Sequence, residues 1–87
     1  MKYKAVTGII LIEICDEYFL ISHEKTISIN FTAAQCWKEF INGTDKTSLI
    51  NMLSAVYDTD DVETLSTDVN SLIDSFYLNH LITRYRQ

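Results

Sequence analysis

The pattern of apolar and polar residues changes its period between Ile27 and Gly43. Up to Phe31 the two kinds of residue alternate, which is the two-residue period of a strand with one buried face. From Thr32 the sequence Thr-Ala-Ala-Gln matches a capping box, and apolar positions then recur at helical spacing. These positions are Ala33, Cys36, Trp37, Phe40 and Ile41. The segment predicts a strand, a junction and a helix over about residues 32–41 that ends before Gly43.

Two further strands are expected before this segment. Residues 9–14 are β-branched and apolar on both faces, and residues 18–22 are aromatic and aliphatic. The Asp-Glu pair at 16–17 supplies a turn between them. Residues 23–25 form a weaker turn, because they include neither Gly nor Asn. Such short connections predict an antiparallel meander whose third strand spans Thr26–Asn30.

Two more helices are expected after this strand and helix. The first begins near Thr47, and the second begins near Asp61, which is a good N-cap. The second ends around residues 79–80, where Asn tolerates the left-handed conformation that ends many helices. Residues 81–82 return as an apolar anchor, and residues 84–87 have the composition of a frayed tail. The apolar stripes of these helices are Leu49, Met52, Leu53 and Val56 in the first and Val62, Leu65, Val69, Leu72, Ile73 and Phe76 in the second.

A block of strands followed by a block of helices predicts an α+β domain. The expected architecture is a small three-stranded antiparallel sheet followed by a three-helix bundle, in a winged-helix-like layout. At 87 residues the chain makes one domain, 1–87, with an ordered core over about residues 9–82. A domain of this size has little interior in which to build a deep catalytic pocket.

The net charge of −5 is unevenly distributed. Between Asp58 and Asp74 there are six acidic residues and no Lys or Arg, which repels a nucleic-acid backbone and attracts a basic peptide. A solvated helix face is the alternative explanation. No apolar run exceeds four residues and no signal peptide is visible, so we expect a cytoplasmic protein that does not enter a membrane.

Catalytic and metal-binding patterns are missing from the sequence. His23 and His80 have no Cys, Asp or Glu at metal-ligand spacing, and there is no phosphate-binding loop or nucleophile motif. The carboxylates fall on polar faces, where nothing tunes their pKa for acid–base work. We therefore expect no enzyme activity, metal or cofactor. Cys15 and Cys36 are expected to be buried, reduced thiols, and Trp37 to be a core residue.

Recognition of a binding partner is the function class that remains, and the third strand is the candidate binding site. In a three-stranded meander the strand Thr26–Asn30 lies at an edge, where unpaired backbone groups must be blocked or used. It contains no Pro, and Lys25 is the only charged residue that guards it. Addition of an extended peptide strand is one use of such an edge. The alternative is that the third helix simply covers the edge, and the residues alone favour neither explanation.

At these residues the sequence resembles the PqqD family of small domains that recognise the precursor peptides of ribosomally made natural products. The resemblance covers about residues 9–82 and depends on the order and spacing of its parts. The matching residues are Ile29 to Ala34, Trp37, Gly43, Thr47, Leu53, Tyr57, Asp68, Val69, Leu72, Ile73, Leu81 and Ile82. Ile29 stands where the family often has Leu, and His80 where it usually has Gly. A Gly-containing turn between the second and third strands is also missing.

The resemblance implies a non-catalytic domain that binds a leader peptide and delivers it to a maturation enzyme, such as a leader peptidase or a radical SAM enzyme. The leader would add as a strand beside the third strand and pack against the third helix. The backbone contacts would fall on Thr26, Ile27, Ser28, Ile29 and Asn30, and the groove would draw on Leu65, Asp68, Val69, Leu72 and Phe76. Asp68 is the best polar candidate, because it lies beside the apolar stripe.

Two other functions remain open. A winged-helix nucleic-acid binder would need Lys and Arg on its recognition helix, and the third helix has none. A scaffold subunit of a larger complex is the other alternative. The unguarded edge strand would also allow a homodimer. The products served could be a cofactor, a lasso peptide or a radical-SAM-modified peptide.

Overall fold

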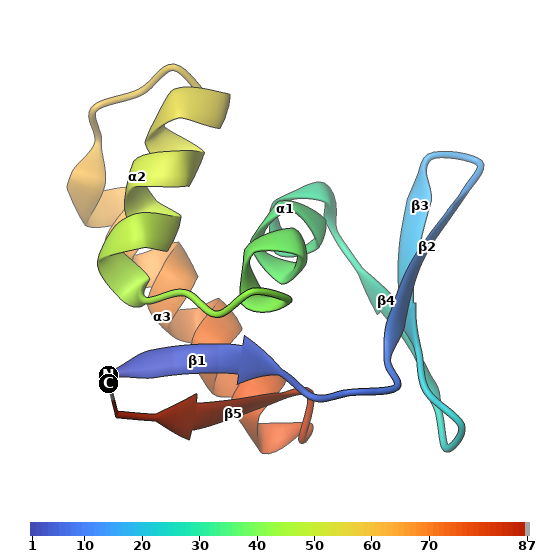
Figure 1. Cartoon of the computed structure of the whole chain (residues 1–87). Helices are drawn as coiled ribbons and strands as arrows, with labels where there is room; N and C mark the ends of the chain where they lie inside the picture. Colours follow the sequence, from blue (N-terminus) through green and yellow to red (C-terminus); the bar gives the residue numbers. More distant parts are fainter. Residues whose placement is uncertain (87) are drawn as a thin grey trace.

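The structure is a computed structural model that describes residues 1–86, and it is an α+β domain of five strands and three helices in that part of the chain (Figure 1). The strands are β1 (Lys2–Ala5), β2 (Ile10–Ile14), β3 (Glu17–Ile21), β4 (Thr26–Ile29) and β5 (Ile82–Tyr85). The helices are α1 (Phe31–Phe40), α2 (Lys46–Val56) and α3 (Val62–Leu78). Figure 1 shows the β2–β3–β4 sheet at one end of the molecule, α2 and α3 at the other, and α1 between them.

The predicted three-stranded antiparallel meander is confirmed, with the strand order β2-β3-β4. The first turn is one residue earlier than predicted, because Glu17 already pairs with Ile14. Its two central residues are Cys15 (φ 51°) and Asp16 (φ 65°). Two positive φ angles in a two-residue loop define a type I′ turn, whose twist matches that of the flanking strands. Cys15 is therefore exposed at the hairpin tip, and the prediction that it is buried is wrong.

The sequence missed a second sheet, in which β1 pairs antiparallel with β5. Lys2 lies opposite Tyr85, so the predicted frayed tail at residues 84–87 is wrong for Arg84 and Tyr85, and Gln87 lies outside the described residues. Tyr3 also exchanges two backbone hydrogen bonds with Thr44, at 2.8 and 2.9 Å. The two ends of the chain are thus tied to each other and to the loop before α2.

Asp and Asn side chains set the start of each helix. Asn30 Oδ1 accepts a hydrogen bond from Ala33 N at 2.8 Å, so α1 begins at Phe31 and the capping box predicted at Thr32 is wrong. Asp45 caps α2 in place of the predicted Thr47, through a 2.8 Å bond from Ser48 N. Asp61 caps α3 as predicted. Each observed cap is the residue whose short side chain reaches the third backbone N–H of its helix.

A Schellman motif ends α3. His80 N donates to Tyr77 O at 3.1 Å, and Leu81 N donates to Phe76 O at 2.9 Å. His80 is the left-handed residue, with φ 60°, whereas Asn79 has φ −89°, so the left-handed conformation is one position later than predicted. Leu81 is buried beneath the turn, as the predicted apolar anchor requires.

The core lies where α1, α2 and α3 meet β3 and β5. Trp37 is 1% exposed and packs edge-on against Phe76, with ring centroids 5.9 Å apart, which confirms it as a core residue. Cys36 is fully buried beside it, and burial, with a smaller contribution from Glu39, raises the pKa of its thiol to about 12. None of the helices in residues 1–86 combines the length and the apolar character that a membrane span requires.

Candidate functional site

A groove of about 500 Å³ runs between β4 and α3. Its walls come from the strand, the start of α1, one face of α3 and the turn after α3. The lining residues are Ile27, Ser28, Ile29, Asn30, Thr32, Ala33, Asp68, Ser71, Leu72, Ser75, Phe76, Asn79 and Leu81. The volume is within the usual range for binding sites, and the groove follows a free sheet edge along its length.

The outer edge of β4 has no neighbouring strand, because β4 is the last strand of its sheet. Ser22 N donates to Lys25 O at 2.9 Å, and this bond fixes which residues of β4 face β3. Antiparallel ladders alternate, so Ile27 and Ile29 direct their backbone groups toward β3. Thr26 and Ser28 therefore direct their N–H and C=O groups to the free edge. The predicted ladder of five residues reduces to these two, since Asn30 O already accepts Ala34 N in α1.

The floor of the groove is apolar. Ile27 and Ile29 point inward from β4 and pack against the core, while Leu72 and Phe76 face them from α3. Phe76 is only 4% exposed and also contacts Trp37, so one ring separates the groove from the only Trp of the chain. The floor thus offers an apolar surface to side chains that point inward from a docked strand.

Seven of the ten predicted binding residues line the groove: Ile27, Ser28, Ile29, Asn30, Asp68, Leu72 and Phe76. Thr26 belongs to β4 but is not among the residues that line the groove. Leu65 is 6% exposed and lines a smaller neighbouring cavity, and Val69 is 1% exposed in the core. The structure brings the first seven together and leaves Leu65 and Val69 outside the groove.

Three polar groove residues were not predicted from the sequence, namely Ser71 and Ser75 of α3 and its C-cap Asn79. With Asp68 and Leu72 they form a stripe at spacings of three and four, which is one face of the helix. The stripe was present in the sequence as a run of small polar residues beside the apolar one. Small side chains on a helix face leave room for another chain, and that signal could have identified them.

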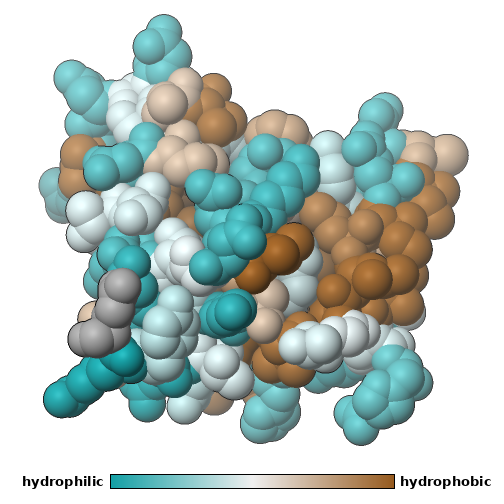
Figure 2. All heavy atoms as spheres, in the orientation of Figure 1, coloured by the Kyte–Doolittle hydropathy of each residue, from teal (hydrophilic) through white to brown (hydrophobic). Residues whose placement is uncertain are grey.

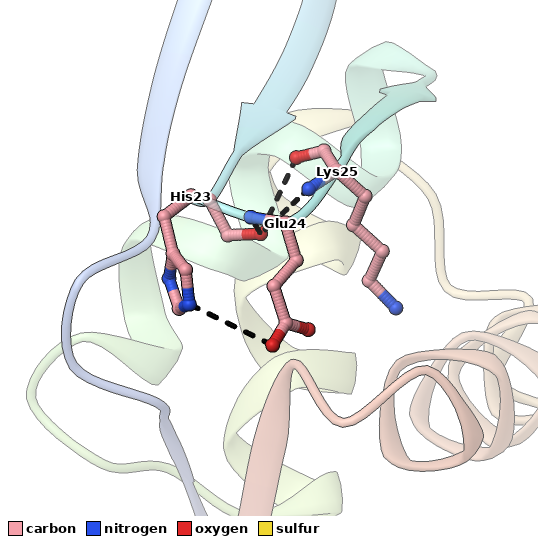
Figure 3. A network of polar contacts seen from close by, with 4 residues as sticks. His23, Glu24 and Lys25 are labelled. Carbon is pink, nitrogen blue, oxygen red and sulfur yellow. Dashed lines mark hydrogen bonds and ion pairs between the residues drawn. The ribbon is translucent and has the colours of Figure 1, made fainter.

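Lys25 closes one end of the groove. Its Nζ donates to the backbone O of Asn79 at 2.9 Å, which ties the turn before β4 to the end of α3. Figure 3 shows the turn, in which the His23 imidazole and the Glu24 carboxylate face each other and the Lys25 side chain points elsewhere. His23 Nε2 and Glu24 Oε1 are 3.6 Å apart. Ser22 Oγ accepts backbone N–H bonds from Glu24 and Lys25, which holds the turn without a Gly. Lys25 therefore binds the helix rather than guarding the strand edge.

The other end of the groove opens toward a smaller cavity of about 250 Å³. Thr32 and Asp68 line both, and the Thr32 hydroxyl is hydrogen-bonded to the Tyr57 hydroxyl at their junction. Phe31 packs edge-on between Tyr18 and Tyr57, at centroid distances of 6.1 and 6.5 Å. This end is therefore aromatic and hydroxyl-rich, and it extends the surface available to a bound chain.

Asp68 is the only charged residue among those that line the groove. Asp61 lies at the neighbouring cavity, and its hydrogen bonds from the Thr64 hydroxyl and backbone N–H lower the pKa of its carboxyl. No group of three or more potential metal ligands occurs among residues 1–86. The geometry suits the binding of an extended chain that has apolar side chains on one face and a Lys or Arg close to Asp68. We identify no catalytic arrangement in it.

Comparison with known proteins places the chain in a family. The model of the family described as coenzyme PQQ synthesis protein D (PqqD) matches residues 17–82. The structure of TbiB1 in complex with the TbiA(beta) leader peptide is similar, with a TM-score of 0.78 and 16% identity over 97% of this chain and 99% of that one. No curated protein matches the sequence.

A second similar structure is the solution structure of the PqqD truncation of PqqCD from Methylobacterium extorquens, a functional and stand-alone recognition element for ribosomally synthesised and post-translationally modified peptides. Its TM-score is 0.81 at 15% identity, over 95% of this chain and 89% of that one. At these identities the structural matches show the fold alone, but the family model covers most of the chain. The chain belongs to the PqqD family.

Proposed function

We propose that this protein is a non-catalytic recognition element that binds the leader segment of a ribosomally synthesised precursor peptide. The leader adds as a strand to the free edge of β4 and packs its inward side chains against α3. The observation that carries the proposal is the groove itself, in which an unpaired strand edge lies opposite a helix face that combines Leu72 and Phe76 with small polar residues. Strand addition gives affinity through the backbone, and the groove gives specificity.

The structural relatives support this proposal. One is a complex with a leader peptide, and the other is a stand-alone recognition element. The domain would hold the precursor while a maturation enzyme, such as a leader peptidase or a radical SAM enzyme, acts on it. The proposed role is compatible with a lasso peptide, a cofactor or a radical-SAM-modified peptide as the final product.

The acidic residues of the groove and of α3 predict which charged residues the leader carries. The groove has Asp68 as its charged residue, and the run from Asp58 to Asp74 contains no Lys or Arg. A leader with Lys or Arg near its docked strand would meet opposite charge, which favours association and fixes register. The same charge opposes a nucleic-acid ligand.

A homodimer through β4 would use the same backbone groups as the leader. Thr26 and Ser28 each have one N–H and one C=O free, so a second copy and a leader strand compete for the edge. Dimerisation through this edge, if it occurs, should therefore decrease as leader is added.

The experiment that tests the proposal is a titration of a short candidate leader against ¹⁵N-labelled protein. We expect amide shifts along residues 26–30 and on the groove stripe of α3. Trp37 fluorescence should report the same event, because Phe76 transmits packing changes from the groove. Shifts that avoid both β4 and α3 would show that the docking mode is wrong.

A further inference from the structure

The two flanks of α3 differ in charge. The groove lies on one flank, where Asp68 is the charged residue of its lining. On the other flank is a second hollow, of about 580 Å³, which we call the basic flank. Three cationic side chains from separate segments line it, namely Lys2 of β1, Lys46 of α2 and Arg86, which follows β5. Figure 2 shows hydrophilic side chains at this end of the molecule, where β1 begins and β5 ends.

The cations of the basic flank have no carboxylate partner within the domain. Among residues 1–86, the one pair of opposite charges within 4.0 Å is His23 with Glu24. Asp45 and Asp74 also line the hollow, but the Asp45 carboxylate is already used to cap α2, where it accepts a bond from Ser48 N at 2.8 Å. The hollow therefore keeps an excess of positive charge in a protein whose net charge is −5.

A fourth cation continues the basic flank along the helix. Arg84 Cζ lies 4.7 Å from the centroid of the Tyr77 ring, which is a cation–π contact. Tyr77 is about two turns beyond Asn70, which lines the hollow, and on the same side of α3. Positive charge therefore extends along this side of the helix over about two turns, opposite the groove.

An extended chain can connect the groove with the basic flank. At 3.6 residues per turn, Asn70 lies about 200° around α3 from Asp68. Val69 is buried in the core, so the exposed way round the helix passes Thr67 and Ser71, whose side chains are small. Half the circumference of a helix about 10–12 Å across is about 15–20 Å, which about five or six extended residues span.

The charge around the basic flank indicates what it binds. The run from Asp58 to Asp74 contains six carboxylates and opposes a long polyanion such as a nucleic acid. A short acidic peptide segment avoids most of that run and meets the cations. The precursor is the source that the geometry favours, because its leader would already be held one helix width away. Such a link raises the effective concentration of any acidic segment attached to the leader.

We propose that the precursor crosses α3, so that its leader strand fills the groove and an acidic segment binds the basic flank at Lys2, Lys46 and Arg86. The proposal rests on the function proposed above and adds a second charge requirement to the leader. A Lys or Arg lies at Asp68, and an Asp or Glu lies about five or six residues from the docked strand. Two contacts of opposite sign also fix the register of the chain on the domain.

The test uses the full chain and two synthetic peptides from the precursor encoded beside this protein. One is the whole leader, and the other is a shorter form restricted to the docked strand. Lys46→Glu and Arg86→Glu reverse the charge at exposed positions of the basic flank. An acidic residue in the first turn of a helix is itself favourable, so Lys46→Glu should not reduce stability. Lys38→Glu, in the last turn of α1 and outside both hollows, is the matched control.

In calorimetric titrations, we expect Lys46→Glu and Arg86→Glu each to weaken binding of the whole leader about three- to fivefold at low salt, and together about tenfold. The loss should largely disappear at about 1 M salt, where charges are screened. The shorter peptide should bind every variant within about twofold of the unchanged protein, and Lys38→Glu should have no larger effect on either peptide. Replacing the acidic leader residue by Lys should restore binding to Lys46→Glu. Circular dichroism checks that each variant folds.

The results separate this proposal from the proposed function. A double variant that binds the whole leader as tightly as the unchanged protein does would overturn the proposal, as would equal affinity of the two peptides. A whole leader that does not bind the unchanged protein would contradict the proposed function and this proposal with it. Binding of duplex DNA that the double variant abolishes would assign the basic flank to a nucleic acid and contradict the proposal.

Discussion

The two sheets of this domain are both antiparallel, but they differ in how much of their edges and faces the chain itself covers. In the β1–β5 sheet, β1 is also bridged to Thr44, and the strands tie the chain ends to the body of the molecule. In the β2–β3–β4 sheet, the edge of β4 stays open beside a groove, and two strands expose an apolar outer face. One sheet is closed by its own chain, and the other keeps surface for partners. The comparison suggests that stability and strand addition are assigned to separate sheets.

The largest effect should come from β5. Ile82 is 2% exposed, and Ile82→Ala should lower the free energy of unfolding by about 2–5 kcal/mol through lost burial and a residual cavity. Leader affinity, measured where the variant is still folded, should change little. Thr83→Ala, at an exposed position of the same strand, is the control. A large loss of leader affinity in a folded Ile82→Ala protein would show that the two sheets are not independent.

The second-largest effect should come from β4, where a substitution should weaken leader binding and leave stability almost unchanged. Ser28→Pro removes a backbone N–H that faces the free edge of β4 and has no partner in the sheet, so stability should fall only slightly. Leader binding should weaken about tenfold or more, because one ladder bond is lost and the ring obstructs the edge. Ser28→Ala keeps the N–H and should bind normally. Calorimetric titration of both variants would sink the edge-docking model if they bound alike.

A smaller effect concerns charge in the groove. Asp68→Lys should weaken a basic leader by about 0.5–2 kcal/mol, and the difference should shrink at high salt. Asp74→Lys makes the same charge change on α3 but lines a different cavity, and so serves as the control. Equal loss in both variants would mean that only the overall charge matters.

The smallest effect is the acid dependence of stability at the helix caps. The hydrogen bonds from Ser48 lower the pKa of Asp45. The positive charges of Lys2 and of the N-terminal amino group lower it further. Asp61, on the groove side, has its pKa lowered by Thr64 alone. A depressed folded pKa gives stability that is present above the unfolded value of about 3.9 and lost as pH falls through the folded value.

We therefore expect thermal stability to decrease modestly as pH falls below about 4. Asp61→Asn keeps a capping oxygen and removes one titrating group, so its pH profile should be flatter. Stability that rises on acidification, with the fold intact, would contradict this account of the caps.

Much of the fold could be predicted from local signals. The meander, the buried part of the apolar stripes and the cap at Asp61 all follow from periodicity and from residues within one turn of their effect. Ile41, Val56 and Val62, at the ends of the predicted stripes, are exposed instead. The β1–β5 sheet could not, because Lys2–Ala5 and Ile82–Tyr85 are short and pair across 77 or more residues of chain. Nothing local distinguishes such a segment from a frayed end.

The candidate site was predicted in outline and not in detail. The edge strand follows from strand order in a meander, but the choice of Thr26 and Ser28 depends on register, which the turn at Ser22–Lys25 sets. The apolar stripe of α3 led to Leu65 and Val69, which pack into the core. The groove uses the neighbouring stripe of small polar residues, because a docked chain needs space as well as apolar contact.

Amide hydrogen exchange on β4 tests the central claim most directly. In the free protein, the amides of Thr26 and Ser28 should exchange fast, because they face the open edge, while those of Ile27 and Ile29 should be protected by β3. Leader binding should slow exchange at Thr26 and Ser28 by an order of magnitude or more. Unchanged exchange at both residues in the presence of saturating leader would contradict strand addition to β4.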